Sequence, residues 1–358
     1  MSGARIQGID LLRGVAVGLV LLRHALPEQF AGAGVVGVVM FFSLSGHLIT
    51  GLLVDEFDRS GTVRLRRFYT NRALRLVPAL LVLVAAFAAV TLVFDPLDDV
   101  ELLPRSVAVA LTWTANLPFA GGSDAIFHLW TLATEEQFYL LWPALLLFAA
   151  RRGRTAWAVA VAAVAGVGVC VASLVWLAPH PDLAYALPTS WVLCFVIGAA
   201  SRYWRGGIRV AAWVTPAALT ALVVLSVLPV RGHVWTYLVV GPLVAVLAAA
   251  LMLRWSKWPV VPAWLHPLVL LGTVSYAAYL WNYPLTLWLR AAFEPLDAAW
   301  LGGLVALPLT VAAAALSWRL VERPVAGWRA RRSAGGVARR AGTLGRQGRS
   351  AGGDQTLT

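Results

Sequence analysis

An arginine and a histidine stand eleven residues apart in the first apolar stretch of the chain, residues 8–26. Asp10 precedes Arg13 and His24 there, and most of the other side chains are apolar. At about 100° per residue, an eleven-residue step returns almost to the same helix face, and Asp10 falls within roughly 40° of it. Charged groups in a membrane helix are costly and usually face a bundle interior or a wet cavity. This stripe is therefore a candidate functional site, and a satisfied buried polar cluster is the alternative.

A second polar stripe lies in residues 128–149. On a helix, His128, Glu135 and Tyr139 fall within about 40° of a common direction. If His128 marks the outer boundary, Glu135 lies about 10 Å deeper, in the membrane half that His24 approaches. A carboxylate that holds an imidazole suits general acid–base chemistry on a hydroxyl group. We therefore expect Glu135 to orient or charge-balance His24, with a structural ion pair as the alternative.

Two arginines with i,i+3 spacing follow the second apolar stretch. On a helix, Arg72 and Arg75 present two guanidinium groups on one face, and this geometry suits phosphate oxygens. A positive loop that anchors the chain to lipid headgroups is the alternative explanation for the same residues.

Smaller polar groups interrupt two further apolar stretches. Ser45 lies in the second stretch, where a small residue permits close helix approach. In the ninth stretch Tyr276, Tyr279 and Tyr283 share one helix face, and Asn282 lies near its edge. A face of this kind can line a polar cavity.

The elements that must position these residues are membrane helices. The chain is 60% hydrophobic and 13% charged, which excludes an ordinary soluble globular domain. The net charge is +12, and the basic residues lie mainly in short loops between apolar spans and in the tail after the last one. The charge therefore indicates membrane topology rather than nucleic-acid binding. Both cysteines fall within apolar runs, so we expect neither a disulfide framework nor a metal site.

Ten stretches are long enough to cross a bilayer at about 1.5 Å per residue. They are roughly 8–26, 34–54, 76–94, 128–149, 156–177, 184–200, 210–228, 234–253, 266–290 and 300–321. Arginine-rich connections alternate with connections that carry Asp and Glu, so the positive-inside rule places both termini in the cytoplasm. The sequence thus predicts an all-α membrane protein of about ten transmembrane helices. A shorter apolar piece, 104–117, is expected to be re-entrant or interfacial.

Together these segments resemble the membrane-bound acyltransferase-3 family, bacterial O-acyltransferases that modify sugars and other hydroxylated acceptors. The segments that carry the resemblance are Ile9-Asp10-Leu-Leu-Arg13-Gly with His24, Phe41-Phe42, Ser45-Gly46, Arg72-Ala-Leu-Arg75, Thr131-Leu with Glu135-Glu136-Gln137-Phe138-Tyr139, Ser275-Tyr276, Tyr279-Leu-Trp281 and Glu322-Arg323-Pro324. We expect an acyltransferase-3-like transmembrane domain over 1–326 and a basic, disordered cytoplasmic tail over 327–358. Some family members carry a fused extracytoplasmic hydrolase-like domain, and we expect none here.

The resemblance implies acyl transfer from cytoplasmic acyl-coenzyme A to an acceptor hydroxyl group, in the bacterial inner membrane. It implies that the first-helix histidine, here His24, is essential, and that Arg72 and Arg75 contact the coenzyme. The chain departs from the family pattern at three positions. Asn282 stands where the family has a histidine, Val39 where it often has an aspartate, and His47 where it has an aromatic residue.

We therefore predict an integral membrane O-acyltransferase that moves an acyl group, expected to be acetyl, from acyl-coenzyme A to a glycan, a lipid-linked sugar or a secondary metabolite. The predicted catalytic residues are His24, as the general base or as an acyl-accepting residue, with Glu135 and Arg13. The predicted coenzyme-binding residues are Arg72, Arg75 and Arg13. The predicted substrate-binding residues are Asp10, Ser45, His128, Tyr139, Tyr276, Tyr279 and Asn282. Membrane lipid is an expected partner, and neither a metal nor nucleic acid is.

Two alternatives come from other functional classes. A transporter or flippase of a lipid-linked or amphipathic metabolite would use the same polar stripes as a substrate path. A non-catalytic relative that binds acyl-coenzyme A is the other alternative, and Asn282 makes it more plausible.

Overall fold

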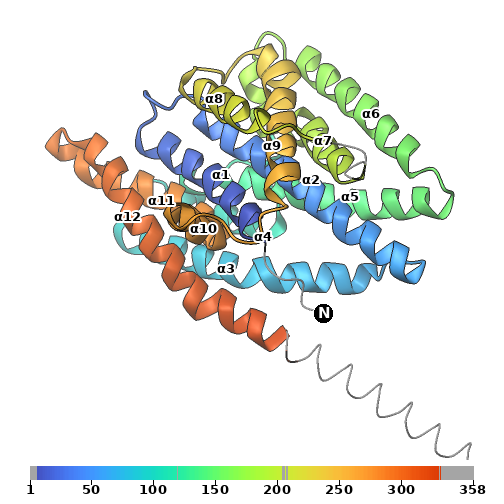
Figure 1. The fold of residues 1–358 in the computed structure, drawn as a ribbon. Coiled ribbons are helices and arrows are strands. Elements are labelled where there is room, and N and C mark those ends of the chain that lie inside the picture. Colours follow the sequence, from blue (N-terminus) through green and yellow to red (C-terminus); the bar gives the residue numbers. More distant parts are fainter. Residues whose placement is uncertain (1–5, 119, 204–205, 207–208, 330, 332–358) are drawn as a thin grey trace, which may run out of the picture.

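The protein is built from helices (Figure 1). A computed structural model describes residues 6–118, 120–203, 206, 209–329 and 331, which contain no strand. The α-helices are α1 Gln7–Ala25, α2 Ala33–Ser60, α3 Leu65–Phe94, α4 Leu103–Thr112, α5 Trp130–Arg151, α6 Thr155–Trp176, α7 Val192–Tyr203, α8 Val214–Val227, α9 Gly241–Trp255, α10 His266–Thr273, α11 Ser275–Phe293 and α12 Ala299–Ser317. Shorter 3₁₀ or π segments are η1 Val100–Leu102, η2 Asp124–Leu129, η3 Pro181–Ala186, η4 Pro188–Ser190, η5 Thr236–Val240, η6 Ala263–Leu265, η7 Glu294–Leu296 and η8 Trp318–Glu322.

Each of the ten predicted stretches contains a helix, but fewer helices satisfy the requirements for a membrane span. Five in the described part are long and apolar enough, or six if the bent pair α10 and α11 forms one span. The helices α7 and α8 are too short, and the polar side chains of α1 and α5 keep those two out of the set. The structure thus confirms an all-helical protein with several membrane-length helices. Ten crossings and the location of the termini stay predictions.

The stretch 266–290, predicted as one helix, is broken. The helix that ends at Thr273 and the one that begins at Ser275 are bent by 71° relative to each other. Gly14 of α1 and Gly272 of α10 allow the two backbones to touch, since a Cβ atom on either glycine would overlap the backbone of the other helix. This contact places Arg13 beside the start of α11.

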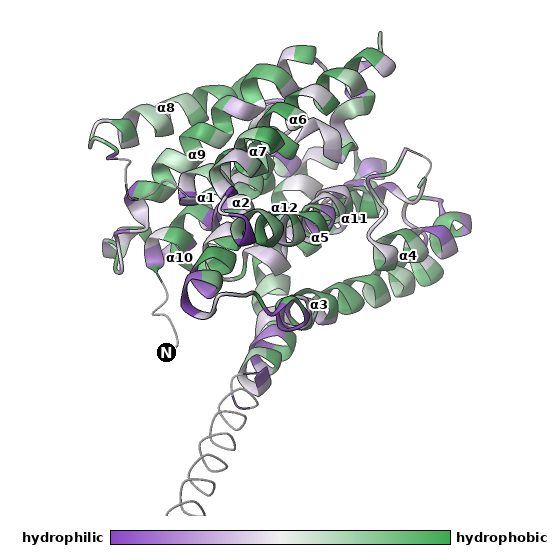
Figure 2. Cartoon of the chain, turned by 90° about the vertical axis from the view of Figure 1, so that its right-hand side faces the viewer, coloured by the Kyte–Doolittle hydropathy of each residue, from purple (hydrophilic) through white to green (hydrophobic). Residues whose placement is uncertain are grey.

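The helix α2 lies at the centre of the bundle and packs against α1, α5, α7 and α9. In the most apolar 18-residue segment of α2, 72% of the residues are buried inside the protein, whereas in that of α6 only 28% are buried. Figure 2 shows that α6 and α8 are hydrophobic along their length although they lie at the periphery. The peripheral helices therefore present apolar side chains to lipid, and α2 with its neighbours encloses the polar residues.

Two other predicted segments have partial counterparts. The apolar piece 104–117 contains α4, which ends at Thr112, and its predicted re-entrant placement stays a prediction. Helical structure continues beyond η8 to residue 329, so the predicted tail begins inside a helix. From residue 332 on, that tail lies outside the described residues.

Candidate active site

Three hollows follow one another along α2. The first, which we call the His24 cavity, has a volume of about 250 Å³ and is lined by residues that include His24 and His128. The second, the Arg72 cavity, has a volume of about 130 Å³, and the third, the arginine cleft, one of about 500 Å³. Val38 and Tyr279 line both the His24 cavity and the Arg72 cavity. Arg72 lines both the Arg72 cavity and the cleft, so the three hollows adjoin in series.

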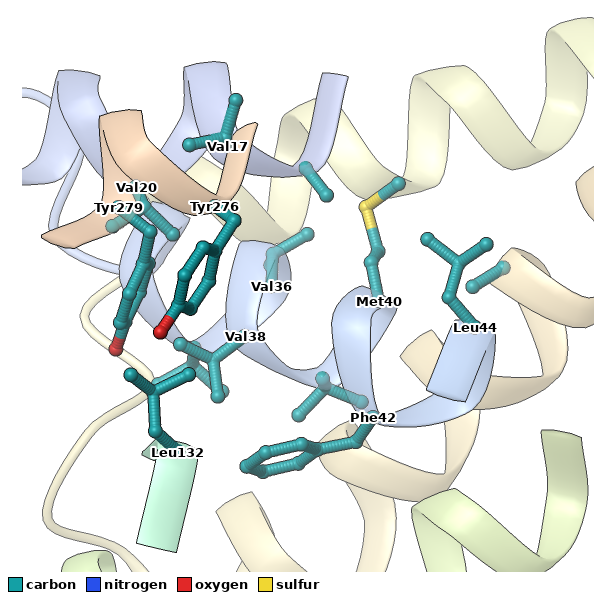
Figure 3. Packing of buried hydrophobic residues seen from close by; sticks show 14 of the residues in the cluster. Val17, Val20, Val36, Val38, Met40, Phe42, Leu44, Leu132, Tyr276 and Tyr279 are labelled. Atoms are coloured by element: carbon teal, nitrogen blue, oxygen red, sulfur yellow. The ribbon is translucent and has the colours of Figure 1, made fainter. Parts of the chain in front are cut away.

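Figure 3 shows four residues that line one or both of these cavities. Tyr276 and Tyr279 of α11 lie side by side with their hydroxyl groups turned the same way, and Val38 and Leu132 lie near them. Both hydroxyl groups are already bonded. The Tyr276 hydroxyl donates to the Leu76 carbonyl at 2.8 Å, and the Tyr279 hydroxyl donates to the His128 carbonyl at 2.9 Å. These bonds hold the two rings in place as walls of the cavities.

The imidazole of His24 is oriented by Asn282, which follows it by 258 residues. The Nδ1 atom of His24 lies 2.6 Å from the Asn282 Oδ1 atom. Asn282 is buried and donates through Nδ2 to the Thr310 hydroxyl at 3.2 Å, so Oδ1 is the atom that faces the imidazole. Nδ1 of His24 therefore carries the hydrogen. The Nε2 lone pair is left free on a ring that lines the His24 cavity.

A second histidine lies close to the first. His128 donates through Nε2 to the Leu280 carbonyl at 3.1 Å. Tyr283 contacts both rings, with its centroid 4.7 Å from that of His24 and 5.5 Å from that of His128. The prediction that His128 begins a helix is slightly wrong, since it lies in η2 and α5 begins two residues later.

Glu135 belongs to the Arg72 cavity and does not reach His24. Its Oε1 atom accepts from the Ser45 hydroxyl at 3.0 Å, and its Oε2 atom lies 3.4 Å from the Tyr139 hydroxyl and 3.7 Å from Arg72. Among the described residues it makes no bond to His24, so the expected pairing is not formed. The seven residues from His128 to Glu135 place the carboxylate about 10 Å further along the chain axis.

The two arginines of the predicted phosphate-binding pair differ in their surroundings. The Arg72 guanidinium bonds Glu136 at 2.7 Å and lies 3.3 Å from the centroid of the Tyr139 ring. Arg75 makes no hydrogen bond or ion pair with any other residue that the structure describes, although it lines both the Arg72 cavity and the cleft. Arg13 also lines the Arg72 cavity and donates to the Ser275 hydroxyl at 2.9 Å. Arg75 is thus the guanidinium of the pair whose N–H groups are available to a ligand.

Two predicted residues, Asp10 and Asn282, line none of these hollows, and two residues at the site, Glu136 and Arg290, were not predicted. Asp10 is buried beside Gly272 and lines neither cavity. Glu136 gave no signal, since it points about 100° away from Glu135 on a helix. Arg290 lies on the Tyr283 face of α11, seven residues further on, so continuing the tyrosine spacing would have found it. No group of three or more His, Cys, Asp or Glu residues in the described ranges is placed to hold a metal ion.

Comparison with known proteins identifies the family. An acyltransferase domain matches residues 6–319. The chain belongs to this acyltransferase family. It is 26% identical over 375 residues to the O-acetyltransferase OatA of Staphylococcus aureus (strain NCTC 8325 / PS 47), a match that covers 89% of this chain and 57% of the relative. Another protein, from S. aureus (strain COL), is named as a putative O-acetyltransferase and is 34% identical over 151 residues. That match covers 40% of this chain and 25% of the relative. The chain thus spans little more than half the length of OatA, and no solved structure matches it.

Proposed function

We propose that this multi-pass membrane protein transfers an acyl group, acetyl in the first instance, from acyl-coenzyme A to a hydroxyl group of a glycan, a lipid-linked sugar or a secondary metabolite. The observation that carries the proposal is the Asn282–His24 bond at 2.6 Å, because it leaves Nε2 of His24 as a base in a cavity. The acyltransferase domain and the O-acetyltransferase relatives support the same reaction class.

In this proposal the two substrates occupy separate hollows. The coenzyme phosphates bind in the arginine cleft, where Arg75, Arg67 and Arg64 lie, and the acyl arm extends through the Arg72 cavity. Arginine-rich loops mark this end of the protein as its cytoplasmic face. The acceptor occupies the His24 cavity and meets the acyl group at the shared boundary of Val38 and Tyr279.

His24 acts as the general base and then as the general acid. The acceptor hydroxyl gives its proton to Nε2 while its oxygen bonds to the thioester carbonyl carbon. The carbon–sulfur bond then breaks, and the coenzyme thiolate takes the proton from Nε2. The products are the ester and free coenzyme A, and His24 returns to its neutral form. Asn282 holds the Nδ1 hydrogen throughout, which keeps the same nitrogen aimed at the substrates.

A transfer assay tests this function. The full chain in lipid nanodiscs is mixed with acetyl-labelled acetyl-coenzyme A and an extract of bacterial envelope as the source of acceptor. We expect base-labile label in the acceptor fraction and an equal amount of free coenzyme A. With the same chain reconstituted in sealed vesicles, movement of unlabelled acceptor across the membrane without coenzyme release would instead identify a transporter. Saturable binding of acetyl-coenzyme A without release would identify a non-catalytic relative.

A further inference from the structure

Three arginines from distant parts of the chain line the His24 cavity. Arg23 precedes His24 in α1, Arg231 lies just before η5, and Arg290 lies near the end of α11. No Asp or Glu lines this cavity among the described residues. The three side chains form no ion pair within that part of the chain either. The cavity therefore carries three positive charges, none of them in an ion pair with a residue that the structure describes.

Each of these arginines is held in position by a contact that leaves its charge in place. Arg290 donates to the His24 carbonyl at 2.8 Å and to the Ala25 carbonyl at 3.2 Å, at the end of α1. The guanidinium of Arg231 lies 4.1 Å from the centroid of the Tyr185 ring. Arg23 lies over Gly34 of α2, where an added Cβ atom would come within 3.0 Å of the Arg23 Cγ atom. The arginines thus form a positioned group around the base.

The Arg72 guanidinium shows the opposite arrangement. It is bonded to Glu136 at 2.7 Å and lies near Glu135, so its charge is met by carboxylates. Partly buried guanidinium groups without a carboxylate favour a ligand that brings negative charge, and arginine matches phosphate and carboxylate in shape. Because Arg290 bonds to the backbone of His24, such a ligand would lie next to the catalytic imidazole.

We infer that the acceptor is an anion, with a phosphate or carboxylate group bound by Arg23, Arg231 and Arg290 while its hydroxyl group faces Nε2 of His24. This inference rests on the proposed function, and it narrows the acceptor to acidic or phosphorylated hydroxyl compounds. A neutral sugar or a neutral metabolite would leave the three charges uncompensated.

A binding measurement tests the anion site without requiring transfer. Thermal unfolding of the purified full chain is followed in saturating coenzyme A, which fills the arginine cleft, and with glucose 6-phosphate, glucuronate or glucose at matched ionic strength. We expect one or both anions to raise the melting temperature at concentrations at least about tenfold lower than glucose requires. The stronger anion identifies phosphate or carboxylate as the preferred group.

Matched variants locate the effect. Arg23→Gln and Arg231→Gln should each weaken anion stabilisation about tenfold. Arg66→Gln should leave it unchanged, because Arg66 is exposed and lines none of the three hollows. Equal effects of glucose and both anions, or full anion stabilisation in Arg23→Gln and Arg231→Gln, would overturn the inference.

The transfer assay separates this inference from the proposed function. After removal of coenzyme A, the labelled product should bind to an anion-exchange resin at neutral pH. A neutral labelled product would refute the anionic acceptor while keeping acyl transfer. Anion stabilisation in a protein that transfers nothing would refute acyl transfer while keeping the anion site.

Discussion

The Nδ1 atom of His24 and the Oδ1 atom of Asn282 lie 2.6 Å apart, and no other described residue bonds to that imidazole. The two residues come from α1 and α11, which pack side by side in the bundle (Figure 1). A neutral amide oxygen therefore selects the tautomer of His24, where a carboxylate was expected to do so.

Asn282 should act as a positioning residue. Asn282→Leu removes the acceptor of the Nδ1 hydrogen, and we expect kcat to fall about tenfold to hundredfold while KM for acetyl-coenzyme A stays unchanged. Asn282→Asp keeps an oxygen at that position and should recover most of kcat. Steady-state coenzyme release measures both variants, and their melting temperatures show whether each one folds. Full kcat in a folded Asn282→Leu variant would contradict this role.

Substitution of Glu135 should not change the ionisation of His24. Glu135→Gln keeps oxygen contacts with Ser45 and Tyr139 but loses its negative charge near Arg72. Since Glu135 makes no bond to His24 in the described structure, we expect the midpoint of the pH–kcat profile to stay in place, with kcat lowered by less than about tenfold. The profile is measured by coenzyme release over pH 5 to about 9. A displaced midpoint would show that the carboxylate is coupled to the imidazole.

Substitution of Arg75 should affect coenzyme binding, whereas substitution of Arg72 should affect stability. Arg75→Gln removes a guanidinium that forms no hydrogen bond or ion pair with a described residue, so we expect KM for acetyl-coenzyme A to rise about tenfold to hundredfold with little change in stability. Arg72→Gln leaves the Glu136 carboxylate without its ion-pair partner, so we expect the free energy of unfolding to fall by about 3 kcal/mol. Denaturant unfolding measures the stability of both variants, and steady-state kinetics measure their KM for acetyl-coenzyme A. Equal effects of both variants on KM, with neither destabilised, would contradict the distinction.

Val38 should control passage between the two cavities. Val38→Phe fills the boundary that it shares with Tyr279, so we expect transfer to be lost while acetyl-coenzyme A still binds. Val38→Ala opens the same boundary and should transfer at close to the original rate. Binding is measured by titration and transfer by label in the acceptor. Normal transfer by a folded Val38→Phe variant would show that the acyl group travels by another path.

Much of the fold could be predicted because apolar length and helical spacing are local properties of a sequence. The ten predicted stretches all contain helix, and the face shared by Tyr276 and Tyr279 lines the cavities as predicted. The break at Val274 was missed, because it depends on the glycine contact between α1 and α10, which no local pattern reveals.

The pairing of side chains between helices could not be predicted in the same way. Spacing within one helix gives the face of a residue but not its depth against another helix. Glu135 and His24 were therefore paired by an estimate of depth, whereas packing places Asn282 and His128 at the imidazole. The role of Glu136 against Arg72 likewise depends on how α3 meets α5.

The central claim is that His24 is the base for acyl transfer, and a single-turnover measurement with His24→Ala tests it most directly. The variant and the original chain are saturated with labelled acetyl-coenzyme A, mixed with the envelope acceptor, and stopped at intervals to count label in the ester. We expect the variant to bind acetyl-coenzyme A normally and to transfer at least about a hundredfold more slowly. Transfer at the original rate by the folded variant would contradict the account.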